Sequence, residues 1–210
     1  MTKMLSLLLM LGAGLAAHAQ IKKGAVLLGG QLSYARITNT NPSSTGPEQI
    51  NKVGNFLVSA GITVKENAVF GLITSYGASN SKYQYQGGST ISTRKQKRSS
   101  AGVFYRKYKQ LFKDLYFFGE GTVLYTSSSQ KETSFTGASA YNYIERGGQV
   151  NLTPGISYNI TRKLQATLSI PSLFAANYSH TNNDQDQFSI FTGLQNTSLG
   201  NLGVGFHVIL

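Results

Sequence analysis

A twelve-residue stretch at positions 149–160, QVNLTPGISYNI, constrains the fold more than any other part of the chain. Apolar residues and proline fill every second position, and small uncharged residues such as Asn151, Ser157 and Asn159 lie between them. Side chains of a β-strand point alternately to opposite faces, so this pattern predicts a strand with one apolar face. A polar face made of small uncharged residues is typical of a transmembrane β-barrel, with hydrocarbon outside and a hydrogen-bonded interior.

The same alternation recurs along the chain and predicts eight strands. We expect them at about residues 25–37, 56–64, 68–78, 99–108, 115–126, 149–160, 164–170 and 199–210. Short turns at 65–67, 109–114 and 161–163 alternate with longer loops at 38–53, 79–98, 127–147 and 177–198. Short periplasmic turns and longer extracellular loops characterise outer-membrane barrels. The sequence therefore predicts an all-β, eight-stranded antiparallel up-and-down transmembrane β-barrel.

Aromatic residues support the same topology. Aromatic side chains of membrane proteins concentrate at the two membrane–water interfaces. We expect one belt near the long loops, at Tyr34, Tyr76 and Tyr125, and a second near the short turns, at Phe70, Tyr105, Tyr108 and Tyr158.

Residues 1–20 have the features of a secretory signal peptide. Lys3 supplies a positive charge, an apolar run follows it, and Ala17-His18-Ala19 resembles a cleavage site. The apolar run is shorter than the roughly 20 residues that a membrane-spanning helix needs. We therefore expect cleavage after this segment, export, and a single barrel domain over residues 21–210.

Composition removes several kinds of chemistry. The sequence contains no cysteine, which excludes disulfides, thiol nucleophiles and thiolate metal sites. It contains no glycine-rich phosphate loop, metal-ligand cluster or nucleophile elbow, so we expect no cofactor and no metal. The formal net charge is +11, but an exported barrel does not meet nucleic acid, so we do not expect a nucleic-acid partner.

Over about 22–210 the chain resembles the eight-stranded outer-membrane β-barrels common in Bacteroidetes, which are similar in shape to the OmpA and OmpX barrels. The resemblance depends on Lys23-Gly24 with Gly29-Gly30, on YFFGEG at 116–121, on PGISY at 154–158 and on the glycine-rich end LGNLGVGF at 199–206. It implies a monomer in the cell outer membrane, in contact with its lipids, lipopolysaccharide among them, and assembled by the outer-membrane insertion machinery. Two positions depart from the pattern. The chain ends in Leu210 instead of an aromatic residue, and Pro154 within a strand predicts a kink or bulge.

Strand parity predicts an ion pair inside the barrel. It directs Arg106 inward from residues 99–108 and Glu120 inward from residues 115–126, with Tyr116, Phe118 and Thr122. An eight-stranded barrel is just wide enough for side chains to fill, and unpaired buried charges are costly. We therefore expect Arg106 and Glu120 to form a structural pair in the lumen.

A basic cluster follows in the expected loop at 79–98. Arg94, Lys95, Lys97 and Arg98 crowd five positions. One interpretation is a solvated charge run. The other is a contact with phosphate groups of lipopolysaccharide or with an acidic surface polymer, because clustered cations attract such anions.

For function, the sequence favours a non-enzymatic barrel whose surface loops serve envelope structure, adhesion or ligand contact. The alternative is a lipid-modifying or proteolytic barrel enzyme that uses His180 with Asp184 and Asp186 in the last loop. His207 has interior parity, and we expect a structural lumen histidine there. A soluble barrel of lipocalin type, with its apolar faces directed inward around a ligand, is a third possibility.

Overall fold

The computed structural model describes residues 21–39, 48–84, 90–134, 141–170, 173–182, 184–192 and 203–210. The expected signal peptide, residues 1–20, lies outside the described residues. Within the described part of the chain, no helix is long and apolar enough to span a membrane.

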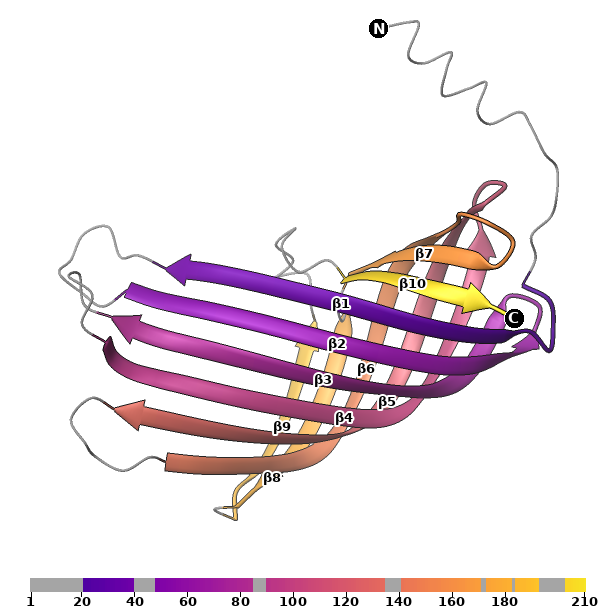
Figure 1. Cartoon of the computed structure of the whole chain (residues 1–210). Helices are drawn as coiled ribbons and strands as arrows, with labels where there is room; N and C mark the ends of the chain where they lie inside the picture. Colours follow the sequence, from indigo (N-terminus) through magenta and orange to yellow (C-terminus); the bar gives the residue numbers. More distant parts are fainter. Residues whose placement is uncertain are drawn as a thin grey trace, which may run out of the picture.

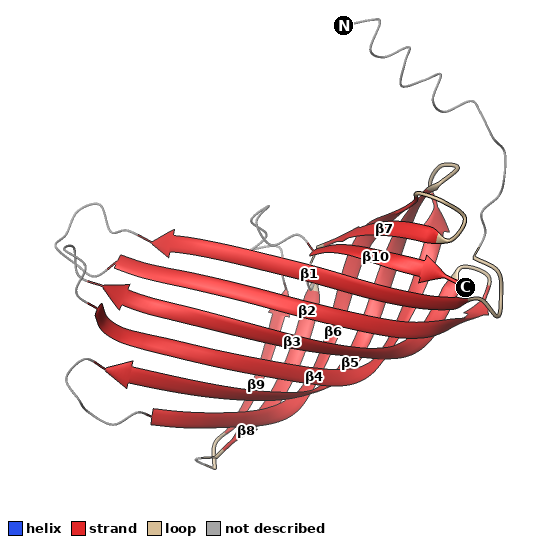
Figure 2. Ribbon diagram, in the orientation of Figure 1, coloured by secondary structure: helices blue, strands red, loops and turns tan. Residues whose placement is uncertain are grey.

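Within the residues that the structure describes, every regular element is a β-strand (Figures 1 and 2). The strands are β1 (Val26–Asn39), β2 (Glu48–Lys65), β3 (Ala68–Gln84), β4 (Thr90–Gln110), β5 (Leu115–Ser134), β6 (Tyr141–Asn159), β7 (Leu164–Ser169), β8 (Phe174–Thr181), β9 (Asp186–Thr192) and β10 (Gly203–Ile209).

The strands form an antiparallel up-and-down ring that is eight strands wide. Neighbours pair from β1 to β6 in sequence order, β6 pairs with β7, and β10 lies between β7 and β1. The register joins the two ends of the chain, with Leu27 opposite Ile209. Ten strands fit a ring of eight because β8 continues the course of β7 along β6, and β9 pairs with β8 on the side on which β10 pairs with β7. The predicted antiparallel barrel is therefore confirmed.

Among the described residues, strand pairing does not close the ring at the end away from the short turns. Within the described residues, β9 pairs with β8 alone, and β1 beyond Leu32 pairs with β2 alone. Phe191 of β9 has inward parity, opposite to that of the outward residues Phe188 and Ile190. Its side chain is nevertheless 56% exposed. The described part of the sheet thus presents two free edges at this end.

Burial separates the two faces and shows which one is apolar. Among the described residues, 36 large hydrophobic side chains are exposed, whereas 10 hydrophobic residues are buried. In β6, Val150, Leu152 and Ile156 point outward, while Asn151 and Ser157 are buried. A soluble protein buries its apolar residues, so this inverted distribution requires an apolar solvent around the barrel. The fold is that of a transmembrane β-barrel, and the lipocalin-type alternative, with apolar faces inward, is wrong.

The strands run further than the apolar alternation predicts. The expected loop at 79–98 is mostly strand, because β3 extends to Gln84 and β4 begins at Thr90. The expected loop at 127–147 likewise contains the end of β5 and the start of β6, and the expected loop at 177–198 contains the end of β8 and all of β9. Most of these extensions have polar residues on both faces, so they lack the alternation of apolar and polar residues that predicts a strand. Their backbones nevertheless continue the antiparallel pairing with the neighbouring strands.

Pro154 does not produce the expected bulge in β6. β6 stays in register with β5 through this position, where Gly119 lies opposite Pro154. On the other side the Pro154 carbonyl accepts a hydrogen bond of 3.0 Å from the Ile170 amide, at the break between β7 and β8. Proline has no amide hydrogen to donate, and its missing donor faces the point where the neighbouring strand is interrupted.

Glycines give the lumen space for aromatic rings. Gly61, Gly71 and Phe104 lie on one row of the register across β2, β3 and β4, and the Phe104 ring is buried over the two glycines. A Cβ atom at Gly71 would overlap the backbone of Ala60 and Gly61 and would lie 2.8 Å from the Phe104 ring.

We expect Gly71→Ala to destabilise the barrel by about 1–3 kcal/mol, because overpacking forces the backbone or the ring to move. Urea unfolding of the protein in lipid vesicles measures the change. Gly121→Ala is the matched control, because a Cβ there meets no atom within 4 Å. If both variants unfold at the same urea concentration as the wild type, the packing of Phe104 on Gly71 is not required for stability.

Candidate functional site

The barrel interior near the short turns holds an ion pair between β4 and β5. Arg106 and Glu120 lie opposite each other in the register. The Arg106 Nη2 atom lies 2.6 Å from the Glu120 Oε2 atom, and Arg106 Nε donates to the same oxygen at 2.8 Å. Both residues are buried, at 6% and 7% exposure. The structure therefore brings together the two residues that strand parity directs inward.

The pair belongs to a larger hydrogen-bond network. Arg106 Nη1 donates to the Tyr108 hydroxyl at 3.2 Å and contacts His207 Nε2 at 3.0 Å. The Tyr108 hydroxyl donates to Gln165, whose amide donates to Asn159. Arginine can only donate, so His207 Nε2 accepts and its proton lies on Nδ1. The network links β4, β5, β6, β7 and β10 across the lumen.

Strand parity predicts which residues of this network point into the lumen, but it does not predict which of them contact one another. His207 is a buried lumen residue, as its parity indicates, whereas Tyr108, expected in the aromatic belt, is buried instead. Tyr108 has the same parity as Arg106, and this is the signal that places it inside. That Gln165 and Asn159 complete the network depends on the register of β6 with β7.

Aromatic rings fill the space around the pair. The Arg106 guanidinium lies 4.7 Å from the centre of the Phe118 ring and 5.8 Å from that of Phe104. Tyr108 packs edge-on against Tyr116, with ring centres 6.3 Å apart. A buried cation is stabilised by aromatic faces as well as by its counter-ion. Side chains therefore occupy the lumen at this level, which does not favour a diffusion pore.

The predicted basic cluster lies on a strand and is divided between two faces. Arg94, Lys95, Lys97 and Arg98 belong to β4, where even-numbered residues point inward and odd-numbered residues point outward. Arg94 pairs with Glu132 of β5 at 3.0 Å, and Arg98 donates to the Gln149 side chain at 3.2 Å. The expectation of a single loop cluster is therefore wrong, because the strand period separates the two arginines from the two lysines.

His180 contacts both carboxylates that the sequence suggests. Its Nδ1 atom lies 3.0 Å from Asp186 Oδ1, and its Nε2 atom lies 3.8 Å from Asp184. The hydrogen bond with His180, and then the one from Tyr178, lowers the pKa of Asp186. The group is largely exposed, and the described contacts of the imidazole are with these two carboxylates. The arrangement can hold a proton between carboxylates, but it shows no activated nucleophile.

Metal ligation has no candidate here. Among the residues that the structure describes, no group of three or more His, Asp or Glu side chains is placed to hold a metal ion.

Comparisons with known proteins show similarity in solved structures only. No protein-family model matches the chain, and no curated protein sequence matches it. The structure is similar to Ail, the attachment invasion locus protein of Yersinia pestis (10% identity, 89% of this chain, 95% of that chain, TM-score 0.38). It is similar to a major outer membrane protein from Thermus thermophilus (12%, 89% and 98%, TM-score 0.43). It is also similar to the outer membrane protease OmpT from Escherichia coli (10%, 89% and 91%, TM-score 0.34). At these values the likeness carries no argument about activity.

Proposed function

We propose that the protein is a non-enzymatic outer-membrane barrel that holds a polar sheet at the cell surface for envelope structure, adhesion or ligand contact. In this proposal residues 1–20 are a cleaved export signal and residues 21–210 form the barrel. The family-level resemblance of 22–210 to Bacteroidetes-type barrels of OmpA and OmpX shape agrees with it. The YFFGEG motif at 116–121 supports that resemblance, because it supplies the lumen residues Tyr116, Phe118 and Glu120.

Strand length is the observation that carries the proposal. β3, β4, β5 and β6 contain 17, 21, 20 and 19 residues. A transmembrane strand needs about 9–11 residues, so these strands continue well beyond the hydrocarbon. Their extensions, such as TSSSQKETS at 126–134 of β5, are polar on both faces. The barrel supports a sheet of this kind, which offers its polar side chains to the outside.

The orientation can be tested with single cysteines, because the protein has none of its own. We expect Ser129→Cys, in the outward face of the β5 extension, to react with a membrane-impermeant maleimide on intact cells. Thr161→Cys, in the turn between β6 and β7, should react only after the cells are disrupted. The reverse labelling pattern would show that the barrel is inserted the other way round.

The contact function can be tested by shortening the extension. Deleting residues 94–97 together with residues 129–132 removes four opposed pairs from β4 and β5 and preserves the face of every remaining residue in the hairpin. We expect this variant to insert and to show normal heat-modifiable migration, but to lose adhesion of the cells that display it or their resistance to detergent. Unchanged adhesion and resistance would show that the function lies elsewhere.

The contacts of His180 favour a second candidate function, a lipid-modifying or proteolytic enzyme. Under the main proposal, His180→Ala with Asp184→Ala leaves envelope lipid composition and peptide cleavage unchanged. A loss of either activity in this variant would favour the enzyme.

A further inference from the structure

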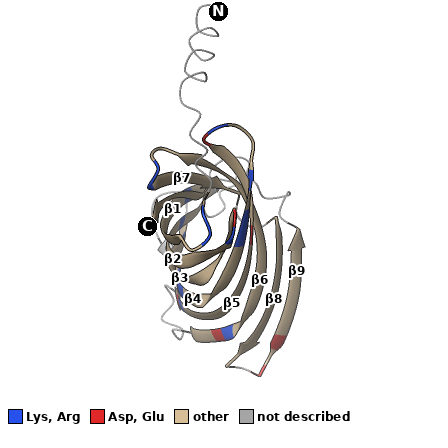
Figure 3. Cartoon of the chain, turned by 90° about the vertical axis from the view of Figure 1, so that its right-hand side faces the viewer, with Lys and Arg blue, Asp and Glu red and all other residues tan. Residues whose placement is uncertain are grey.

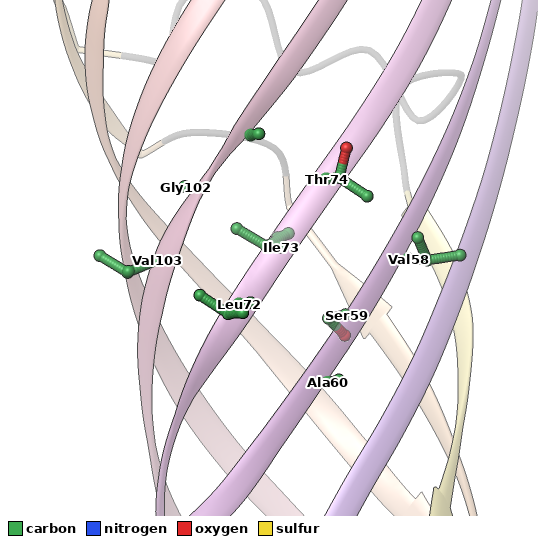
Figure 4. A pocket seen from close by; sticks show the side chains of 9 residues that line it. Val58, Ser59, Ala60, Leu72, Ile73, Thr74, Gly102 and Val103 are labelled. Carbon is green, nitrogen blue, oxygen red and sulfur yellow. The ribbon is translucent and has the colours of Figure 1, made fainter.

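The outer surface of β2, β3 and β4 carries two grooves, one basic and one apolar. The basic groove has a volume of about 280 Å³, and Lys52, Lys95 and Lys97 surround it. The apolar groove has a volume of about 610 Å³, and Val58, Leu72 and Val103 are among the residues that line it (Figure 4). In the register of β2 with β3, it lies nearer to the short turn than the basic groove does. Both grooves lie on the same three strands.

Small outward residues create the basic groove. Gly54 and Ala78 lie opposite each other in the register and form its floor, with Tyr34 beside them on β1. Long lysine side chains rise around this floor, and all three lysines are exposed. None of the three has an ion-pair partner among the described residues, so their ammonium groups are available to an anion.

Further cations lie next to the basic groove. Arg36 of β1 lies opposite Lys52, and Lys131 of β5 lies opposite Lys95. All four side chains are on the outward face of the sheet. Arg94 contributes little outside, because it pairs with Glu132 on the inner face. Figure 3 shows how Lys and Arg are distributed over the strands. The described outer face of this region thus attracts a ligand with more than one negative charge.

The apolar groove is formed by a change in side-chain size. Val58, Leu72 and Val103 flank a floor that includes Ala60, Thr74 and Ala101. The register places Val58, Thr74 and Ala101 on one row and Ala60, Leu72 and Val103 on the next. The result is an open apolar groove on the lipid-facing surface, with a volume of about 610 Å³.

The distance between the two grooves allows one amphiphilic molecule to occupy both of them. Along β3, Ala78 of the basic groove lies four positions from Thr74 of the apolar groove, which corresponds to about 13 Å at roughly 3.3 Å per residue. The outward residues between the grooves include Phe56 and Tyr76, which face each other across β2 and β3 and are typical of a membrane interface. A phosphate group is therefore favoured on the side of the basic groove, and an acyl chain on the side of the apolar groove.

We propose that β2–β4 bind the lipid A part of lipopolysaccharide. The phosphate groups lie against Lys52, Lys95 and Lys97, and one acyl chain lies in the groove over Ala60, Thr74 and Ala101. A lipid with several phosphates and several chains fits both the charge and the two-part shape. This inference rests on the proposed outer-membrane location and names the lipid that the outer surface selects.

The test uses the full mature protein in nanodiscs of phosphatidylcholine, titrated with purified lipid A. Native mass spectrometry counts the lipid A molecules that stay bound. We expect wild type to retain lipid A in preference to phosphatidylglycerol, and Lys52→Gln, Lys95→Gln, Lys97→Gln in combination to weaken retention at least tenfold. Ala101→Phe, which fills the apolar groove without a change of charge, should weaken it as well.

The matched control replaces three lysines at the opposite end of the barrel, Lys107, Lys109 and Lys163, by glutamine. This variant has the same net charge as the first triple variant and should retain lipid A as the wild type does. Equal losses in both triple variants, or full retention in Ala101→Phe, would overturn the proposal. Heat-modifiable migration of every variant is measured in parallel. Failure of the wild type to insert would count against the outer-membrane location itself, which separates that outcome from a failure of the lipid site.

Discussion

Replacing Arg106 by alanine is expected to destabilise the barrel by about 3–5 kcal/mol, because it leaves Glu120 buried without its counter-ion. Glu120→Ala should have a similar effect for the converse reason. The two side chains contact each other at 2.6 Å in a lumen surrounded by aromatic rings. Replacing both residues removes both charges, so the double variant should lose less stability than the sum of the single losses. Equilibrium urea unfolding in lipid vesicles gives the three values.

The exposed pair of Arg94 and Glu132 is the internal control for this experiment. Its N–O distance is 3.0 Å, but its side chains are 43% and 35% exposed. Ion pairs in contact with water contribute about 0–1 kcal/mol, so the same set of alanine variants should have small effects there. Additive losses at Arg106 and Glu120 would show that the two residues do not depend on each other, in spite of their contact.

Placing a charge on the apolar exterior is expected to have the second large effect. Ile156 points outward from β6, and its register neighbours Phe117 and Leu168 are also apolar and exposed. Arginine on the lipid face of a barrel costs about 2–4 kcal/mol near the bilayer midplane and less toward the interfaces. Ile156→Arg should therefore impair assembly, which is measured as the folded fraction by heat-modifiable migration and as stability by urea unfolding.

Ser129→Arg provides the matched control, because Ser129 also faces outward but lies in the polar extension of β5, beside Lys97 and Ile144. We expect this variant to assemble normally. Equal tolerance of arginine at both positions would contradict the assignment of the apolar band around Ile156 to the hydrocarbon of the membrane.

The fold class and the orientation of the side chains follow from the amino-acid sequence alone. A strand has a period of two, so the alternation around Val150 and Asn151 is enough to assign each residue to the outer or the inner face. Parity in two separate strands was also enough to direct Arg106 and Glu120 into the lumen. Where the residues on both faces are polar, as in 79–98, the sequence carries no such signal, and the expected strands were too short.

Which residues meet depends on the tertiary structure, because register is a property of two strands and not of one. It joined Tyr108, Gln165 and His207 to the lumen pair. It also placed the basic cluster on a strand, and the period of that strand directs the arginines inward and the lysines outward. It also brought Lys52 of β2 into one groove with Lys95 and Lys97 of β4, more than 40 positions further along the chain. Such neighbours cannot be found from spacing along the sequence, since the pairing of β2, β3 and β4 sets the distance between them.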